Sequence, residues 1–176
     1  AVIERVALEA ERRQHGTPSG VDHGTVLRGG VLWMQPDGEG GVHPTPLEPV
    51  PDALDGLAVC HTGTPIETTG EMIAAVRRRF AGRRADLEVI LDGIGEDAGE
   101  LRRVLTGTRS ARGLGHLLRS CERHLEALGV VPERVRRIVR ALEDEGGSDK
   151  ISGAGGISGG RAGSLLAYHP GRAASA

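Results

Sequence analysis

The chain has 176 residues, a formal net charge of −2 and 38% hydrophobic residues, the composition of an ordinary folded domain. This near-neutral charge gives no reason to expect nucleic acid or a membrane surface as a partner. Aromatic residues make up only 2% of the chain, which argues against a base-stacking platform. No apolar run approaches the ~20 residues of a membrane span, so we expect a cytoplasmic protein with free thiols at Cys60 and Cys121.

The first fifty residues predict short elements separated by turns. Residues 1–14 are compatible with either a helix or a strand, and a weak helix is expected from Asp22 to about Leu27. A strand over 31–34 and a turn over 36–41 follow. The return strand from Val42 is expected to break early, because prolines stand at positions 44, 46, 49 and 51, and this segment predicts a domain boundary.

The rest of the chain predicts an α+β arrangement, with helices between two short strands. We expect a buried strand over 57–60, then a helix that begins at the capping box of Thr68 and Glu71 and ends at Gly82. Periodic apolar positions predict further helices over 86–105 and 114–128, and one that begins with Pro132 at its first helical position. A glycine-rich loop over 150–160 and a strand over 164–168 complete the prediction.

Two stretches carry candidate chemistry. Residues 11–24 combine Glu11, a histidine, a serine and Asp22 with glycines that force sharp turns, and an acid at a helix start after such a loop is typical of anion and metal sites. An ordinary surface loop with a capping aspartate is the alternative. The loop over 150–160 begins with Lys150, the only lysine, and its backbone amides could converge on one anion. It lacks the P-loop and dinucleotide motifs, and a flexible linker is its alternative.

Three blocks of the sequence, in this order, resemble those of the mevalonate kinases in the GHMP kinase superfamily. The first runs from His15 to Asp22, the second comprises 62–65 with 69–72, and the third runs from Lys150 to Gly156. The resemblance implies an ATP-dependent phosphorylation of mevalonate to phosphomevalonate with Mg²⁺, on an α+β fold. That fold is the end of the superfamily's N-terminal domain, ribosomal protein S5 domain 2-like, over 1–56, followed by its ferredoxin-like C-terminal domain over 57–176.

The resemblance also implies roles for individual residues. Asp22 would be the catalytic base that accepts the proton of the mevalonate hydroxyl, and Glu11 would bind Mg²⁺. Substrate-binding positions would be His15, Gly16, Ser19, Gly20, Thr62 and Thr69. The phosphate loop would comprise Lys150, Ser152, Gly153, Ala154, Gly155 and Gly156. The second block leaves open which of Thr62, Thr64, Thr68 and Thr69 contacts the substrate.

The sequence also departs from the family pattern. Thr17, His23 and His61 replace the usual residues, an extra residue stands near Ile66, and the third block is longer because it continues through 157–160. The family's catalytic lysine block and its ATP-wrapping loop have no counterpart, since they precede the point where this sequence starts. We therefore expect the 176-residue chain alone neither to bind ATP tightly nor to turn over. A phosphomevalonate kinase, a mevalonate 3-kinase, and a non-catalytic subunit paired with a nucleotide-binding half are the alternatives, and a homodimer is a further one.

Overall fold

The computed structural model describes residues 2–15, 20–38, 41–49, 54–110 and 113–171. The chain divides into two compact units, residues 1–50 and 51–176, and each is described by itself. The expected boundary between residues 56 and 57 stays a prediction. Among the described residues, no helix combines the length and the apolar character needed to cross a membrane.

The described part of unit 1, residues 1–50, contains two helices and a β-hairpin. Helix α1 (Val2–His15) packs against α2 (Val21–Arg28), and α2 contacts β1 (Val31–Pro36), which pairs antiparallel with β2 (Val42–Leu47). The first residues therefore form a helix rather than a strand. The expected early break of the return strand is wrong, because β2 runs through prolines 44 and 46. These two residues lie two positions apart, so the N–H groups they lack face the same, unpaired edge.

Unit 2, residues 51–176, contains a three-stranded antiparallel sheet in the order β3-β5-β4, formed by β3 (Leu57–His61), β4 (Ser148–Ser152) and β5 (Ser164–Tyr168). β5, which comes last of these three strands in the sequence, thus lies between β3 and β4, as in a ferredoxin-like unit. The α+β fold class is confirmed. The expectation that the strand over 57–60 is buried is wrong, because β3 is an edge strand whose residues 58–61 are exposed.

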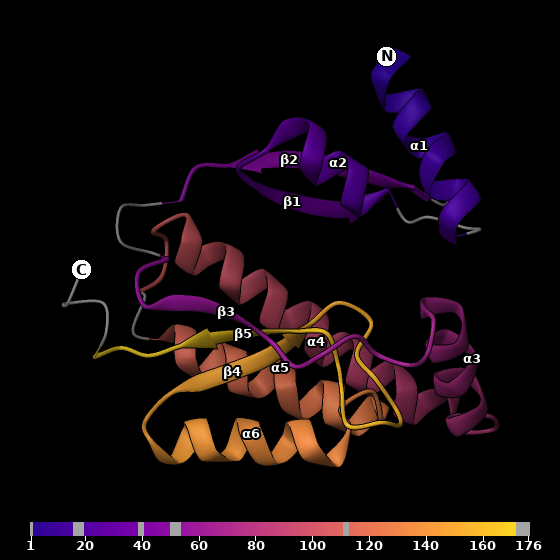
Figure 1. The fold of residues 1–176 in the computed structure, drawn as a ribbon. Coiled ribbons are helices and arrows are strands. Elements are labelled where there is room, and N and C mark those ends of the chain that lie inside the picture. Colours follow the sequence, from indigo (N-terminus) through magenta and orange to yellow (C-terminus); the bar gives the residue numbers. More distant parts are fainter. Residues whose placement is uncertain (1, 16–19, 39–40, 50–53, 111–112, 172–176) are drawn as a thin grey trace. The chain divides into compact units, whose positions relative to one another are not determined.

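Four helices of unit 2 connect β3 to β4, as Figure 1 shows. They are α3 (Thr69–Arg79), α4 (Arg84–Leu105), α5 (Leu114–Leu128) and α6 (Glu133–Asp144). The capping box is confirmed, since the Glu71 N–H donates to Thr68 Oγ1 at 3.3 Å and the Thr68 N–H donates to Glu71 Oε2 at 2.8 Å. Pro132 is the N-cap of α6 rather than its first helical residue.

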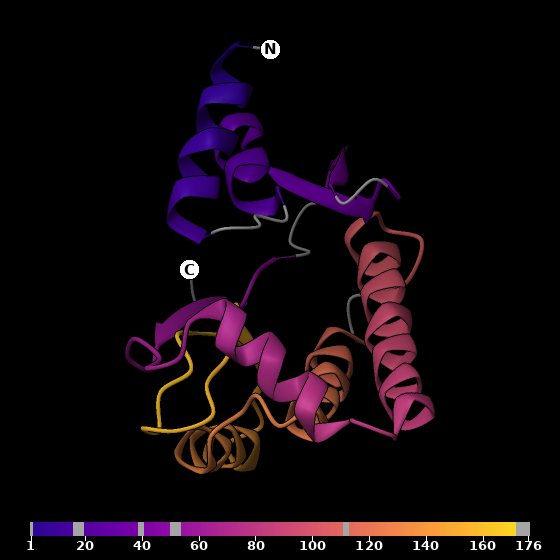
Figure 2. The same ribbon diagram turned by 90° about the vertical axis from the view of Figure 1, so that its right-hand side faces the viewer.

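The hydrophobic core of unit 2 lies between its sheet and its helices. Helices α4 and α5 pack on each other (Figure 2), and both α5 and α6 contact β4. Ile151 of β4 and Leu165 of β5 are each 1% exposed, and Val135 and Val139 of α6 are fully buried. These residues belong to one cluster, which fixes β4 and therefore the start of the segment that follows it.

Candidate functional site

In unit 1, Glu11 is held against the beginning of α2. The backbone N–H of His23 donates to Glu11 Oε1 at 2.7 Å, and the His23 ring Nδ1 lies 3.0 Å from Glu11 Oε2. Both side chains are largely buried, with 16% of Glu11 and 15% of His23 exposed. A second contact between the same helices, from Arg28 Nη2 to Glu4 Oε1 at 2.8 Å, fixes their alignment.

Asp22 is exposed in the first turn of α2, directly before the residue that binds Glu11. Gly20, the N-cap, has a φ of 87°, a conformation that favours glycine, and its carbonyl accepts the Gly24 N–H at 3.2 Å. Gly24 is buried, and a Cβ there would lie 3.4 Å from the Met34 side chain. Glu11 and Asp22 thus lie where α1 packs against the start of α2, a region that we call the acidic corner, and their roles stay predictions.

Three expected substrate residues of this corner lie wholly or partly outside the described residues. Gly16 and Ser19 belong to the undescribed segment, and only the backbone of His15 is described, at the end of α1. The described residues contain no group of three or more His, Cys, Asp or Glu side chains placed to hold a metal. Mg²⁺ commonly takes most of its ligands from phosphates and water, so a single carboxylate suits it in kind, and Glu11, whose two oxygens contact His23, stays a predicted ligand.

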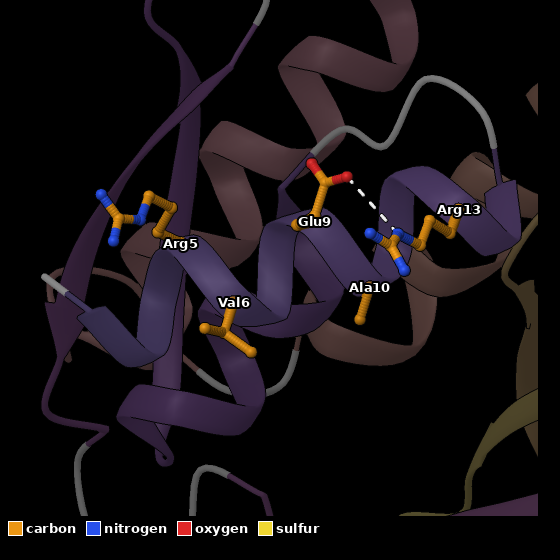
Figure 3. Close-up of a pocket in the computed structure, with 5 residues that line it drawn as sticks. All are labelled: Arg5, Val6, Glu9, Ala10 and Arg13. Atoms are coloured by element: carbon orange, nitrogen blue, oxygen red, sulfur yellow. Dashed lines mark ion pairs between the residues drawn. The ribbon is translucent and has the colours of Figure 1, made fainter.

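The opposite side of α1 forms an open hollow. Figure 3 shows that it is lined by side chains of one helix face, with an ion pair between Glu9 and Arg13 at 3.5 Å. Val2, Ile3 and Val6 are between 62% and 70% exposed. Glu9 is thus an exposed counterpart to Glu11 on the same helix.

In unit 2, two expected phosphate-loop residues lie on a strand instead. Lys150 and Ser152 belong to β4 and pair with residues 166 and 164 of β5, so the expected loop over 150–160 begins too early. The Lys150 ammonium donates to the Ile151 carbonyl at 2.8 Å. Strand formation here follows from the burial of the Ile151 side chain. The glycine-rich loop that the structure contains spans residues 153–163, between β4 and β5, and we refer to it as the glycine loop.

The glycine loop is tightly packed at Gly155 and Gly156. The Gly156 N–H donates to the Val130 carbonyl at 2.9 Å. A Cβ at Gly155 would lie 2.3 Å from that carbonyl oxygen, and one at Gly156 would lie 2.0 Å from the Arg161 carbonyl oxygen. The loop is therefore an ordered turn rather than a flexible linker. In the described part of the chain, no intramolecular acceptor is found for the amides of Gly153 and Ala154, so they are free to donate to an anion.

The threonines after β3 differ in how their hydroxyls are used. Thr62 Oγ1 donates to the Gly163 carbonyl and accepts the Ala162 N–H, both at 2.9 Å. Thr68 Oγ1 donates to Glu71 Oε2 at 2.9 Å as part of the capping box. Thr64 and Thr69 make no such contact within the described residues, and both are exposed. Thr69, the first residue of α3, thus keeps its hydroxyl available, whereas the Thr62 hydroxyl holds two loops together.

Glu67, which the sequence did not single out, contacts the glycine loop directly. Its Oε1 accepts the Ser158 N–H at 2.8 Å and the Ser158 hydroxyl at 2.6 Å, and its Oε2 accepts the Ile157 N–H at 3.3 Å. The hydrogen bond from the Ser158 hydroxyl is the main cause that lowers the pKa of Glu67 to about 2, with the two backbone N–H groups acting in the same direction.

Two buried carboxyl groups lie at β4, one on a neighbouring helix and one on the strand itself. Glu122 of α5 is fully buried, and its Oε2 accepts the Ile151 N–H at 2.9 Å. Loss of hydration raises its pKa to about 7. Asp149 of β4 is also fully buried, and its carboxylate oxygens have no hydrogen-bond partner among the described residues. Burial, followed by the charge of the nearby Glu143, raises its pKa to about 6, against the opposing effect of Arg119 and Arg123. Glu122 follows Leu118 by four positions, so it lies on the apolar face of α5, and this spacing could have predicted its burial from the sequence.

Several mevalonate kinases are similar to this chain, although no protein-family model matches it. It is 30% identical over 161 residues to the mevalonate kinase of Mus musculus, which covers 88% of this chain and 38% of that protein. It is 27% identical over 175 residues to the mevalonate kinase of Pyrococcus horikoshii, covering 97% of this chain and 48% of the relative. The chain thus spans less than half the length of these curated relatives.

Solved structures show the same fold. A mevalonate kinase from L. major, crystallised in complex with R-mevalonate, matches 96% of this chain and 49% of its own with a TM-score of 0.76 at 21% identity. A Lin0012 protein from Listeria innocua matches 73% of this chain and 35% of its own with a TM-score of 0.59 at 21% identity. The chain is therefore similar, over nearly its whole length, to the C-terminal half of mevalonate kinases, and it has the fold of that part.

Proposed function

We propose that the protein to which this chain belongs transfers a phosphoryl group from ATP to the hydroxyl of mevalonate. The observation that supports this substrate is the similarity to mevalonate kinases across 88% to 97% of the chain. Asp22, which ends the most specific block of the sequence, and Glu11, which precedes it by eleven residues, support the reaction type. Because the relatives are about twice as long, we also propose that the nucleotide site is supplied by sequence outside these residues.

In this proposal, Asp22 orients the substrate hydroxyl and accepts its proton as the oxygen attacks the γ-phosphorus. Its exposure at the start of α2 leaves the carboxylate open to a ligand, and the helix N-terminus stabilises its negative charge. Mg²⁺, when bound, neutralises charge on the transferring phosphoryl group. Glu11 would be its protein ligand, held in place by His23.

The glycine loop would face the phosphates in this proposal. Amides that have no intramolecular acceptor stabilise negative charge that develops on phosphate oxygens during transfer. Gly153 is exposed and has a φ of 102°, and apart from its chain neighbours no atom lies within 4 Å of the point where a Cβ would stand. Lys150 and Ser152, which lie on β4, would act from the strand end rather than from the loop.

The decisive experiment measures ADP release by the complete protein with mevalonate, phosphomevalonate, homoserine and galactose as separate substrates. We expect turnover with mevalonate and with none of the other three compounds. Replacement Asp22→Asn should lower kcat by at least about a thousandfold while ATP affinity stays nearly unchanged, because only the proton acceptor is lost. The 176-residue chain by itself should show no turnover.

The matched control for the metal-ligand role is a pair of variants on α1. Glu11→Gln should raise the Mg²⁺ concentration needed for half-maximal activity, whereas Glu9→Gln, on the exposed face in Figure 3, should not. Turnover with phosphomevalonate but not with mevalonate would show that the protein is a phosphomevalonate kinase and contradict the proposed substrate. Unchanged kcat in Asp22→Asn would remove Asp22 from the reaction.

A further inference from the structure

Two connecting segments of unit 2 run side by side beyond the sheet. Residues 62–68 lead from β3 to α3, and the glycine loop leads from β4 to β5. At their base the Thr62 N–H donates to the Gly163 carbonyl at 2.8 Å, and the Gly163 N–H donates to the Gly63 carbonyl at 3.0 Å. The pairing of β3 and β5 therefore continues into the two connections and fixes where the glycine loop ends.

Farther along, the same two segments meet again at Glu67. Three donors, the N–H groups of Ile157 and Ser158 and the Ser158 hydroxyl, converge on this one carboxylate. Two successive backbone N–H groups and a hydroxyl that point at one anion are typical of an anion-binding turn. Here the anion is a side chain of the protein itself.

A neighbouring contact supports the same arrangement. A Cβ at Gly159 would lie 2.4 Å from Ile66 Cδ1, so the Ile66 side chain packs directly over this glycine. Gly159 has a φ of 68°. Ile66 and Glu67 belong to the part of the second block with an extra residue, and residues 157–160 are the part by which the third block is longer. The two departures from the family pattern thus contact each other in the structure.

We propose that Glu67 is a positioning residue that holds the far end of the glycine loop and thereby sets the direction of the amides at Gly153 and Ala154. The loop is anchored on one side by the Val130 carbonyl and on the other by Glu67. Without the second anchor, residues 157–160 lose the contact that limits their backbone. This inference rests on the proposed function only in its claim that the loop faces phosphates.

The first test concerns the contact itself and needs no substrate. In Glu67→Gln, a side-chain NH₂ group replaces one acceptor and faces the amide donors, so the amides of Ile157 and Ser158 should exchange with solvent at least tenfold faster than in the wild-type chain. Glu96→Gln, an exposed carboxylate on α4, should leave those rates unchanged. Equal exchange rates in wild type and Glu67→Gln would overturn the proposal.

A double-mutant comparison identifies the partner. Ser158→Ala removes the hydroxyl that makes the 2.6 Å contact with Glu67. If Glu67 acts through Ser158, the exchange rate of the Ile157 amide in the double variant Glu67→Gln/Ser158→Ala should be close to that of Glu67→Gln alone. If the increase in exchange rate in the double variant equals the product of the increases in the two single variants, a direct link between the two side chains is overturned.

The second test separates positioning from general stability. In the complete protein, Glu67→Gln should raise the KM for ATP at least fivefold and leave the KM for the alcohol substrate and the midpoint of thermal unfolding unchanged. A lower unfolding midpoint with an unchanged KM for ATP would show a structural role only and overturn the proposal. If Glu67→Gln speeds the exchange of the Ile157 and Ser158 amides but the complete protein phosphorylates no alcohol, the contact is confirmed and the proposed function is rejected.

Discussion

The two units of the chain hold their candidate chemistry in different ways. In unit 1, only Gly24 is buried among the described residues, and Glu11 is positioned by polar contacts between two helices. In unit 2, the glycine loop begins at a strand whose Ile151 is 1% exposed inside a continuous apolar core. We conclude that the loop depends on hydrophobic packing, whereas the acidic corner depends on a few hydrogen bonds and ion pairs.

The largest expected effect follows from the core of unit 2. Leu165→Ala empties a site that is 1% exposed, so the free energy of unfolding of unit 2 should fall by about 3 kcal/mol. Val26→Ala, at a unit 1 position that is 83% exposed, should change stability by less than about 0.5 kcal/mol. Urea unfolding followed by circular dichroism measures both, and similar losses in the two variants would break the contrast between the units.

The second prediction concerns the buried carboxyl of Glu122, whose pKa is raised from 4.5 to about 7. Because the folded state binds the proton more tightly, this group's favourable contribution is complete below pH 4.5 and is lost as pH rises to about 7. Glu122→Gln removes the titration and keeps an acceptor for the Ile151 N–H. Relative to wild type, the variant should therefore gain up to about 3 kcal/mol between pH 4 and pH 8.

Chemical denaturation at several pH values checks this prediction. The matched control is Glu96→Gln, which makes the same substitution at an exposed position of α4. A pH-independent difference for Glu122→Gln would show that the carboxyl is hydrated in solution.

The third prediction tests local structure at the edge of unit 2. Thr68→Ala removes the hydroxyl that accepts the Glu71 N–H, so the free energy of unfolding should fall by about 1 kcal/mol. Thr64→Ala, at an exposed threonine with no described hydrogen bond, should have almost no effect. Thermal unfolding of both variants shows whether the loss of stability comes from the helix cap or from the removal of any threonine in this segment.

The smallest expected effect lies in unit 1. His23→Ala removes the ring contact with Glu11 Oε2 but leaves the backbone N–H that donates to Oε1, so α1 and α2 should lose about 0.5 kcal/mol of mutual stabilisation. Exchange rates of the amides in α2 measure this loss. A loss of several kcal/mol would mean that this corner is held as firmly as the core of unit 2.

Much of the secondary structure followed from local patterns. Apolar spacing located α3 to α6, and the capping box fixed the start of α3. β4 was missed because residues 148–152 show four polar side chains around one isoleucine, and Asp149 is buried against expectation for an acid. β3 was expected to be buried because its residues are apolar, yet it is an edge strand. The role of Glu67 depends on contacts with residues ninety positions away, which no local pattern encodes.

The glycines of the loop after β4 have a consequence for binding. Backbone atoms of Val130 and Arg161 occupy the space where side chains at Gly155 and Gly156 would lie, so the loop is confined although its residues are intrinsically free. Its conformational entropy is therefore lost when the chain folds rather than when a ligand arrives. A ligand that binds such a preordered turn loses less affinity to ordering than it would on a flexible linker of the same composition.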